Sequence, residues 1–350
     1  MIQATVELKK VLRLRAQGAL LVDVRTPAEF SEATIPGAVN VPIFSNEERA
    51  EIGTLYKQQG KGVARKRGIE VVSPKIPQLM EQVEVLRRGC NGPVVVFCWR
   101  GGMRSLAMTS LMNLAGIHAR QLIGGYKAFR SHICAYFEEA DWQPIYVLRG
   151  LTGVGKTQVL HHLAEQGYPV VDLEGLANHR GSAFGALGLP QQPGQKMFEA
   201  LLWDRLLQLR DAAYLLTEGE SLHIGRLLVP KRFHQAMQVQ TSLWLGASLD
   251  FRTKIILQDY PALDQLREQF EKPICALKER LGKKIVNQLL GLLNEGRWEE
   301  LVYELMVHYY DPLYLHTKPE QRVEIELESV DAGVERVAAA LQELTSSPES

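Results

Sequence analysis

A single cysteine lies where a strand is expected to pass into a helix. Residues 93–96 form an apolar run that predicts a buried parallel strand, and a helical pattern follows over residues 103–115. Two glycines in the intervening loop let backbone N–H groups surround an anion, and two arginines add positive charge. We therefore expect a lowered thiol pKa and a catalytic nucleophile at Cys98, rather than a merely structural buried cysteine. The predicted anion-binding loop consists of Arg100, Gly101, Gly102, Arg104 and Ser105.

A second strand–loop–helix segment has the pattern of a phosphate-binding loop. Residues 145–149 predict a parallel strand, and the next eight residues read GLTGVGKT, which matches GxxxxGK[ST] ahead of a helix over residues 157–166. The glycines expose backbone N–H groups to a diphosphate, Lys156 neutralises its charge, and Thr157 has the hydroxyl that holds Mg²⁺ in such loops. We expect Mg²⁺ as a cofactor and a phosphate site formed by Gly150, Gly153, Gly155, Lys156 and Thr157.

Acidic residues follow two of the remaining predicted strands. The strands are expected at residues 168–172, 214–217, 241–245 and 322–327. Glu218 and Glu220 follow the second of these, and Glu218 stands where a Walker-B acid would stand, although Thr217 rather than an aspartate precedes it. Catalytic acids of such folds lie just past strand carboxyl ends. Thr157 and Glu218 are therefore the candidate metal ligands, and helix caps or surface acids are the alternative.

Two further stretches carry more chemistry than a nucleotide kinase requires. Residues 172–185 read DLEGLANHRGSAFG, which places a histidine and an arginine in a loop of small residues near the phosphate-binding loop. We interpret it as a second anion-binding loop, with the candidate residues Asp172, Glu174, His179, Arg180 and Ser182. Residues 309–314 read YYDPLY, and these tyrosines could stack on nucleic-acid bases or pack in a core.

Composition limits the class of protein. A length of 350 residues favours two domains, and 46% hydrophobic with 23% charged residues is typical of a soluble globular protein. The 40 basic and 40 acidic residues cancel, so any nucleic-acid contact must come from local basic patches. Four cysteines without CxxC pairing argue against zinc and disulfides and favour a reducing cytoplasm. No signal peptide and no apolar run of about 20 residues is found, so we expect no membrane partner.

Predicted strands alternate with predicted helices, which indicates parallel α/β sheets. In the first half, residues 5–16 have helical spacing, residues 19–23 form a strand, and helices are expected at residues 75–88 and 126–138. Trp142-Gln143-Pro144 marks a boundary, so the predicted domains are residues 1–140 and 141–350.

Basic residues gather at two places. Residues 57–67 hold five of them and no acid, which is typical of either a solvated loop or an arm that contacts a polyanion. Residues 276–284 are expected to end a helix with a second basic cluster, where the helix dipole favours cations in any case.

The first half resembles a single rhodanese domain. The resemblance rests on VDVRTPAEF, IPGAVNVP, the strand ending at Cys98, and IGGYKAFR, in that order. It implies that Cys98 carries a chalcogen as a persulfide-type adduct, and that Asp23 and Arg25 are structural. Small sulfurtransferases of this fold commonly have C-x-x-G-x-R, whereas Arg104 gives C-x5-R here, which is similar to phosphatases on the same fold. This longer loop suits a tetrahedral anion, and the spacing leaves phosphatase and chalcogen transferase both open.

The whole chain resembles the tRNA 2-selenouridine synthases. The residues that carry this resemblance are CWRGGMRS, GLTGVGKT, DLEGLANHRGSAFG and YYDPLY, with a rhodanese domain preceding a P-loop domain. The resemblance implies a cytoplasmic enzyme that replaces sulfur by selenium in wobble-position 2-thiouridine of tRNA. It also implies an S-geranyl intermediate made from geranyl diphosphate, selenophosphate as selenium donor, and selenophosphate synthetase as a further partner.

Three other functions remain open on the residues alone. A P-loop kinase fused to a rhodanese sulfur carrier would consume ATP, and a rhodanese-fold phosphatase would hydrolyse phosphoesters at Cys98. A non-catalytic anion-sensing module fits least well, because both loops keep their reactive residues.

Overall fold

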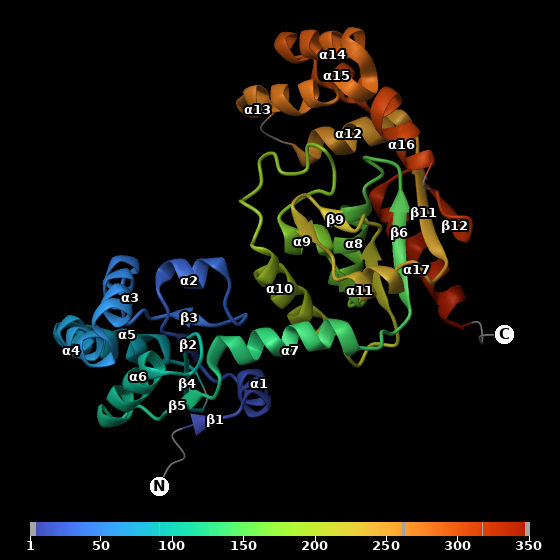
Figure 1. Cartoon of the computed structure of the whole chain (residues 1–350). Helices are drawn as coiled ribbons and strands as arrows, with labels where there is room; N and C mark the ends of the chain where they lie inside the picture. The colour runs from blue at the N-terminus through green and yellow to red at the C-terminus, as the bar shows by residue number, and fades with distance from the viewer. Residues whose placement is uncertain (1–4, 91, 261–262, 317, 347–350) are drawn as a thin grey trace. The chain divides into compact units, whose positions relative to one another are not determined.

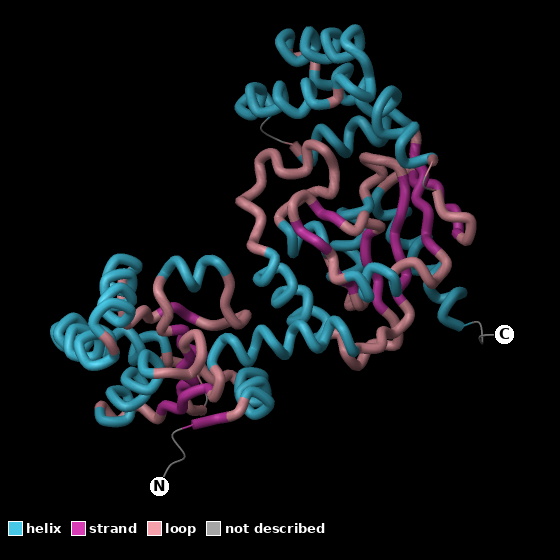
Figure 2. The backbone as a smooth tube through the Cα atoms, viewed as in Figure 1, coloured by secondary structure: helices cyan, strands magenta, loops and turns pink. Residues whose placement is uncertain are grey.

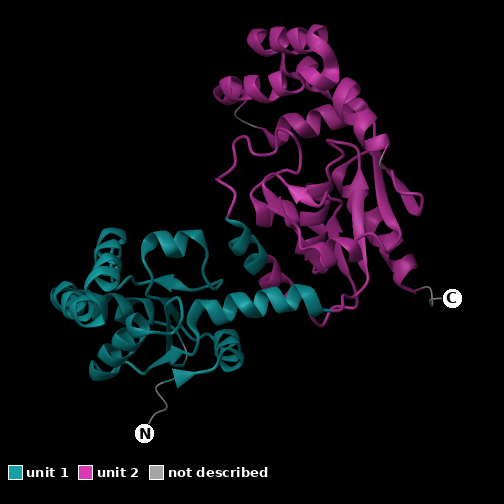
Figure 3. Cartoon of the chain, viewed as in Figure 1, with its two compact units in different colours: residues 1–140, 194–201 teal, residues 141–193, 202–350 magenta. Residues whose placement is uncertain are grey.

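Two compact units divide the chain in the computed structural model, which describes residues 5–90, 92–260, 263–316 and 318–346 (Figure 3). Unit 1 comprises residues 1–140 and 194–201, and unit 2 comprises residues 141–193 and 202–350. From the sequence alone we assign residues 194–201 to the second domain, whereas the structure groups them with unit 1. They form the first part of helix α10 (Gln195–Gln208), whose remainder belongs to unit 2.

Unit 1 is built on a five-stranded parallel sheet with the strand order β1-β5-β4-β2-β3 (Figure 1). The strands are β1 (Thr5–Val6), β2 (Leu21–Asp23), β3 (Val39–Asn40), β4 (Val94–Phe97) and β5 (Ala119–Leu122). The helices are α1 (Leu8–Ala16), α2 (Pro27–Glu32), α3 (Asn46–Gln59), α4 (Lys61–Val72), α5 (Ile76–Leu86), α6 (Met103–Leu114) and α7 (Gly125–Glu139), with a 3-10 turn at Ser73–Lys75. The predicted parallel α/β arrangement is confirmed.

Strand β4 is buried along its whole length. Val96 and Cys98 face a core that includes Met108 of α6. Val95 and Phe97 point to the opposite face because side chains alternate along a strand, and both are fully buried there as well. A continuous apolar run is therefore required in β4. Cys98 follows at the carboxyl edge of the sheet.

Two predictions for unit 1 are wrong in detail. Residues 57–67 are not a loop, because α3 and α4 form a helical hairpin that turns at Gly60, whose φ is +89°. Ser45 and Glu48 form a capping box that starts α3, which fixes where this hairpin begins. At the N-terminus, Thr5–Val6 are not helical but pair with β5 as an edge strand.

Unit 2 contains a second five-stranded parallel sheet with the order β12-β11-β6-β8-β7. Its strands are β6 (Ile145–Gly150), β7 (Val170–Val171), β8 (Leu215–Glu218), β11 (Ser242–Ala247) and β12 (Arg322–Leu327), and a small antiparallel pair is formed by β9 (His223–Ile224) and β10 (Leu227–Leu228) (Figure 2). The helices around them are α8 (Lys156–Glu165), α9 (Leu173–Ala177), α11 (Lys231–Ala236), α12 (Leu249–Asp259) and α17 (Val330–Ser346).

The phosphate-binding loop follows the carboxyl end of a strand that is packed in the centre of this sheet. Leu148 of the central strand β6 packs in one cluster with Leu160 of α8 and Val337 of α17. The chain leaves the carboxyl end of β6 at Gly150 and enters α8 at Lys156. The loop therefore lies where parallel α/β folds bind ligands.

A group of helices follows β11 and forms a second core of unit 2. We call α13 (Leu263–Ala276), α14 (Lys278–Glu295), α15 (Trp298–Leu305) and α16 (Asp311–Leu315), with the π-helical turn η2 (Met306–Tyr310), the helical cluster. Its core includes Phe270, Leu289 and Leu301. The expected helix end at residues 276–284 is found only in part: α13 ends at Ala276, Lys278 and Arg280 precede a non-helical break at Gly282, and Lys283 and Lys284 begin the rest of α14.

One continuous helix runs through the last third of the helical cluster. The hydrogen-bond pattern changes from α-helical to π-helical at Met306 and back at Asp311. Both residues keep right-handed helical φ and ψ, so α15, η2 and α16 form a single rod from Trp298 to Leu315. The π-helical turn in its middle shifts the side chains that follow it around the axis. No helix within residues 5–90, 92–260, 263–316 and 318–346 has both the length and the apolar composition needed to cross a bilayer.

Candidate functional site

The Cys98 thiol lies in a ring of hydrogen-bond donors. Its Sγ is 3.3 Å from the backbone nitrogen of Gly102, which donates to it, and 3.2 Å from Ser105 Oγ. Only 3% of Cys98 is exposed. Burial raises the pKa of the thiol, but the hydrogen bonds from Ser105 and Gly102 and the charge of Arg104 outweigh burial and leave the pKa lowered. Cys98 therefore has the electronic setting of a reactive thiol.

Two glycines and a glutamine fix the conformation of the Cys98 loop. Gly101 has φ +64°, and a Cβ there would lie 2.6 Å from the carbonyl oxygen of Leu122. A Cβ on Gly125 would lie 2.2 Å from the Cys98 carbonyl oxygen, so IGGYKAFR must present glycine at this point. The Nε2 of Gln121 donates to the carbonyl oxygens of Gly101 and Gly102, at 2.8 and 3.0 Å. One side chain thus holds two carbonyl oxygens of the loop.

The two arginines of this loop have different surroundings. Arg104 forms a two-point ion pair with Glu29 of α2, at 2.6 and 3.3 Å, and is half-buried. Arg100 is exposed. Arg25 is buried against Asp23, with its Nη2 2.6 Å from Asp23 Oδ2, which ties the end of β2 to the same edge of the sheet. The two arginines therefore differ in exposure, because Arg104 is held by Glu29 while Arg100 faces solvent.

The phosphate-binding loop of unit 2 closes on itself. Lys156 Nζ donates to the carbonyl oxygens of Gly150 and Leu151, each at 3.2 Å. Gly150 has φ +148°, and a Cβ there would lie 2.3 Å from the Leu245 carbonyl oxygen of β11. Gly153 has φ +80°, and a Cβ there would lie 2.7 Å from the Arg252 carbonyl oxygen of α12. The glycines of the motif are therefore required for packing as well as for exposing N–H groups.

Three carboxylates surround Lys156. Burial raises the pKa of Glu174, Glu218 and Glu220, and mutual repulsion among them adds to it for Glu218 and Glu220. Burial lowers the pKa of Lys156, against the attraction of these same carboxylates. Acids held this close together with little solvent around them are an unfavourable arrangement that a bound cation would relieve.

The metal candidates are only partly brought together. Thr157 Oγ1 lies 3.1 Å from Glu174 Oε2, so these two oxygens form a pair of the kind that Mg²⁺ prefers. Glu218 instead accepts a hydrogen bond from the Glu174 backbone nitrogen at 2.6 Å and is almost fully buried. Among the described residues no three His, Cys, Asp or Glu side chains converge to hold a metal ion by themselves. A metal here would need oxygens of its ligand as well.

The predicted second anion loop divides into two groups. Glu174, Arg180 and Ser182 line the pocket at the phosphate-binding loop. Asp172 and His179 do not line this pocket. Asp172 caps α9 through the Gly175 nitrogen and contacts His161 Nε2 at 2.8 Å, and buried His179 accepts a hydrogen bond from the Gly181 nitrogen. Asp172 and His179 therefore stabilise the conformation of this loop through hydrogen bonds and do not face the pocket.

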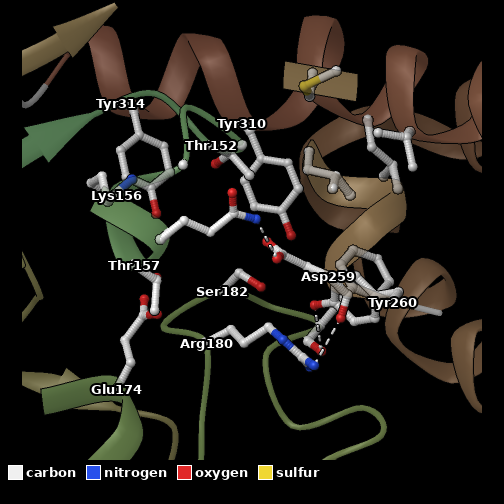
Figure 4. A pocket seen from close by; sticks show the side chains of 18 of the residues that line it. Thr152, Lys156, Thr157, Glu174, Arg180, Ser182, Asp259, Tyr260, Tyr310 and Tyr314 are labelled. Atoms are coloured by element: carbon white, nitrogen blue, oxygen red, sulfur yellow. Dashed lines mark hydrogen bonds between the residues drawn. The ribbon is translucent and has the colours of Figure 1, made fainter. Parts of the chain in front are cut away.

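The pocket itself has a polar and an apolar half. It encloses about 1200 Å³ including its open mouth, and Figure 4 shows Lys156, Thr157 and Glu174 on one side and Tyr260 on the other. The apolar half is lined by Phe184, Ile256, Leu263, Phe270, Trp298, Leu301, Val302, Leu305 and Met306. Most of these residues come from the helical cluster, more than 100 positions after the phosphate-binding loop. Sequence reasoning missed this wall, because apolar helical spacing alone does not tell a pocket lining from a core.

The continuous helix runs along the pocket from one half to the other. Tyr314 lies near the phosphate-binding loop, with Lys156 Nζ 5.9 Å from its ring centroid, and Tyr310 follows toward the apolar half (Figure 4). Trp298, Leu301 and Leu305 recur at intervals of three and four residues, so they share one face of α15. The YYDPLY stretch therefore belongs to the pocket wall.

A buried ion pair joins this helix to the phosphate-binding loop. Arg252 of α12 donates through Nε to the Thr152 carbonyl oxygen at 2.8 Å and through Nη1 to Asp311 Oδ2 at 2.9 Å. Arg252 is only 2% exposed, so losing Asp311 would leave a buried guanidinium half satisfied. Neither residue was singled out from the sequence, although Asp311 lies within YYDPLY, because nothing local indicates a partner 59 residues away.

Comparison with known proteins finds matches to both units. The family model of the tRNA 2-selenouridine synthase AAA domain matches residues 143–345, and that of the rhodanese-like domain matches residues 7–132. Proteins named tRNA 2-selenouridine synthase from Nitrosomonas europaea, Shewanella frigidimarina and Bdellovibrio bacteriovorus are each 32% identical to this chain. The matches cover 87%, 87% and 88% of this chain and 90%, 90% and 91% of the relatives.

Proposed function

Since the chain belongs to the tRNA 2-selenouridine synthase family, we propose that it modifies wobble-position 2-thiouridine of tRNA in two steps. The first step transfers a geranyl group from geranyl diphosphate to the sulfur, in the pocket of unit 2. The second step replaces the geranylated sulfur by selenium from selenophosphate, at the Cys98 loop of unit 1.

The observation that carries the first step is the two-sided pocket. Geranyl diphosphate has a strongly charged end and an apolar tail, and the pocket offers a phosphate-binding loop at one side and an apolar helical wall at the other. A nucleotide needs the first side, but it does not need a wall of leucine, phenylalanine and methionine. The match between the two halves of the pocket and the two halves of the ligand supports a prenyl diphosphate over ATP.

The wall is long enough to accommodate the same ligand. Sixteen residues separate Tyr314, beside Lys156, from Trp298 at the start of α15. At about 1.5 Å per residue the helix accompanies the pocket for about 24 Å. An extended chain gains about 1.2 Å per bond, so the seven bonds from C1 to C8 of a geranyl group need only about 8 Å of that length.

The charges around the diphosphate support a divalent cation as cofactor. Thr157 and Glu174 would hold Mg²⁺, and the ion would neutralise the diphosphate as it departs. Lys156 would leave the loop carbonyls that it contacts in the structure and turn to the phosphate oxygens. The raised pKa values of Glu174, Glu218 and Glu220 fit a site that is completed by positive charge.

The chemistry explains why two loops would be needed. Sulfur on C2 of a pyrimidine is a poor leaving group until it is alkylated. In the first step the sulfur bonds to C1 of the geranyl group, and the C1–O bond breaks to release diphosphate. In the second step selenium bonds to C2, the C2–S bond breaks to release geranylthiol, and water takes the phosphoryl group as phosphate. The backbone N–H groups, Arg100 and the thiol of the Cys98 loop would bind the tetrahedral selenophosphate anion.

A transfer assay tests the proposal. Purified protein, tRNA containing 2-thiouridine, geranyl diphosphate and Mg²⁺ should yield S-geranyl-2-thiouridine by nucleoside mass spectrometry without ATP. Competition should rank inorganic diphosphate below dimethylallyl diphosphate and dimethylallyl below geranyl diphosphate, by at least about tenfold in the last step, because each buried CH₂ contributes up to about 0.8 kcal/mol. Strict ATP dependence would favour the kinase alternative, and release of phosphate from simple phosphoesters would favour the phosphatase.

A further inference from the structure

A polar patch interrupts the pocket wall where the two halves meet. Asp259, the last residue of α12, lies between Lys156 and Thr157 on one side and Tyr260 on the other, and Tyr310 and Ser182 lie beside it (Figure 4). A prenyl diphosphate that places its phosphates on the loop and its tail along the apolar wall would have its C1 atom at this junction. The junction is therefore the place where the bond to sulfur would form.

The Asp259 carboxylate is held in position without being neutralised. Gln158 Nε2, from the residue that follows the loop threonine, donates to Asp259 Oδ1 at 3.2 Å. Arg180 donates through Nη2 to the Asp259 backbone oxygen at 2.9 Å, and its guanidinium stacks on the Tyr260 ring at 4.4 Å. The nearest cation is thus engaged by a carbonyl and a ring, and the carboxylate itself is oriented by an amide.

The proposed first step requires a group that accepts a proton. When the sulfur of 2-thiouracil bonds to a carbon, the N3–H electron pair becomes the new double bond between N3 and C2. The N3 proton must leave, or the product remains a cation. A carboxylate close to the sulfur both accepts this proton and stabilises the positive charge that develops on the ring and on C1.

We propose that Asp259 is the catalytic base that takes the N3 proton of 2-thiouridine during S-geranylation, an inference that rests on the proposed function. The sulfur–C1 bond forms, the C1–O bond breaks with its electron pair going to diphosphate, and the proton passes from N3 to an oxygen of Asp259. Gln158 holds the carboxylate at the angle that this transfer needs.

The other pocket carboxylates lie at the wrong end for this role. Glu174 contacts Thr157, and Glu174 and Glu220 both interact with Lys156, so they face the diphosphate and its cation. Asp259 is the acid on the side of the reacting carbon. Burial raises the pKa of Asp259, while the Gln158 hydrogen bond and the charge of Arg180 oppose that rise. Tyr260 and Tyr310, which flank it, have raised pKa values because they are buried, so they stay neutral.

The test is single-turnover geranylation by the full chain with Asp259→Asn, at saturating geranyl diphosphate, over a range of about pH 5 to 8. The amide keeps the shape and loses the basic oxygen, so the rate should fall by about a hundredfold or more. The wild-type rate should rise with pH until Asp259 is ionised and then level off, and this rise should disappear in the variant. Binding of geranyl diphosphate, measured by isothermal titration calorimetry, should be unchanged.

Two further variants separate chemistry from folding. Asp259→Glu should recover part of the rate, because it restores a carboxylate. Asp250→Asn changes an exposed acid at the start of the same helix and should have the wild-type rate. A normal rate and pH profile in Asp259→Asn would overturn this inference alone, as would a rate loss that only mirrors lost geranyl diphosphate binding. Absence of S-geranylated product from the wild type would overturn the proposed function and this inference with it.

Discussion

The Cys98 loop and the phosphate-binding loop share one backbone design and balance charge in opposite ways. Each follows the carboxyl end of a buried parallel strand, turns through glycines and feeds a helix. Around Cys98, a backbone nitrogen, a hydroxyl and an arginine lower the pKa of the thiol. Around Lys156, the pKa values of the carboxylates are raised and that of the lysine is lowered.

The Cys98 loop holds an anion of its own, the thiolate, whereas the phosphate-binding loop has a charge arrangement that suits a bound diphosphate and a divalent cation. The first loop is electrostatically complete when its thiol is ionised. The second holds a lysine on its own carbonyl oxygens and three acids close together, which a diphosphate and a divalent cation would rearrange. The first loop is therefore suited to present a nucleophile, and the second to bind a charged ligand and release it. The predictions below test this contrast.

The largest expected effect is that a change in each loop abolishes a different step of the proposed reaction. Cys98→Ser should reduce selenium insertion by about a hundredfold or more, because it removes the ionisable thiol at the centre of the loop that would hold selenophosphate, and S-geranyl-2-thiouridine should accumulate. Lys156→Ala should instead reduce geranylation by about a hundredfold to a thousandfold, because it removes a charge that stabilises the departing diphosphate. Nucleoside mass spectrometry of tRNA incubated with each variant measures both products. Normal 2-selenouridine formation by Cys98→Ser would break the comparison.

The next effect concerns tRNA, for which each unit offers one basic helix. Lys61, Arg65 and Lys66 lie in the first half of α4, and a second set, Lys283 and Lys284, directly follows the break at Gly282 in α14. Lys61, Lys283 and Lys284 lie in first helical turns, where the dipole disfavours cations by about 0.3–1 kcal/mol each, so helix stability does not explain these three. We expect these residues to contact phosphates of the tRNA backbone.

Replacing Lys61, Arg65 and Lys66 together by Ala should lower tRNA affinity and reduce the slope of log affinity against log salt by about two to three units. Preference for 2-thiouridine should be kept, because phosphate contacts carry no base information. Arg67→Ala is the matched control, because Arg67 is already paired with Glu51 at 2.6 Å and should change the slope less. A salt titration measures the slope, and equal slopes for the triple variant and the wild type would show a merely solvated surface.

A smaller effect tests the apolar wall that only the second loop has. Leu301→Ala removes three side-chain carbons and should raise the KM for geranyl diphosphate by about tenfold with little change in kcat, because losing the burial of about two CH₂ equivalents against the tail costs roughly 1.5 kcal/mol of uniform binding. Tyr303 lies on the same helix but is 44% exposed and does not line the pocket, so Tyr303→Ala should behave as wild type. Steady-state kinetics below the melting temperature of the variant measures both. Equal KM values for dimethylallyl and geranyl diphosphate in the wild type would contradict a tail-binding wall.

The smallest effect is a pair of opposite pH dependences of stability. A carboxyl whose pKa is raised on folding binds more protons in the folded state, so Glu218 lowers the free energy of unfolding as pH rises from its unfolded pKa toward its raised folded value. A thiol whose pKa is lowered releases its proton earlier in the folded state, so Cys98 adds stability as pH rises from its lowered pKa toward its unfolded value.

Melting curves in chelator measure this contrast. Glu218→Gln keeps an oxygen for the Glu174 nitrogen, and it should raise the melting temperature relative to wild type more at about pH 8 than at about pH 5. Cys98→Ala should lower the relative melting temperature more at the higher pH. Parallel pH curves for the wild type and both variants would mean that the two loops do not differ in charge balance.

Local sequence was sufficient to predict both loops and the sheets that carry them. A run such as residues 93–96 buries both faces of a strand, and glycines such as Gly101 and Gly153 permit backbone angles and close approaches that few other residues allow. Strand, turn and helix signals act over a few residues, so spacing alone indicates where Cys98 and Lys156 stand. The same local signals failed for residues 57–67, because a basic composition looks the same in a loop and in an exposed helical hairpin.

The pocket was decided only by tertiary structure. Leu301 and Trp298 reach the phosphate-binding loop across more than 140 positions of sequence, Arg252 finds Asp311 across 59, and Asp259 meets Gln158 across 101. In the sequence each of these residues has the ordinary spacing of an amphipathic helix or the ordinary exposure of a surface acid. Their roles depend on which helix faces pack together, and packing is set by the sum of many small apolar contacts rather than by any one local pattern.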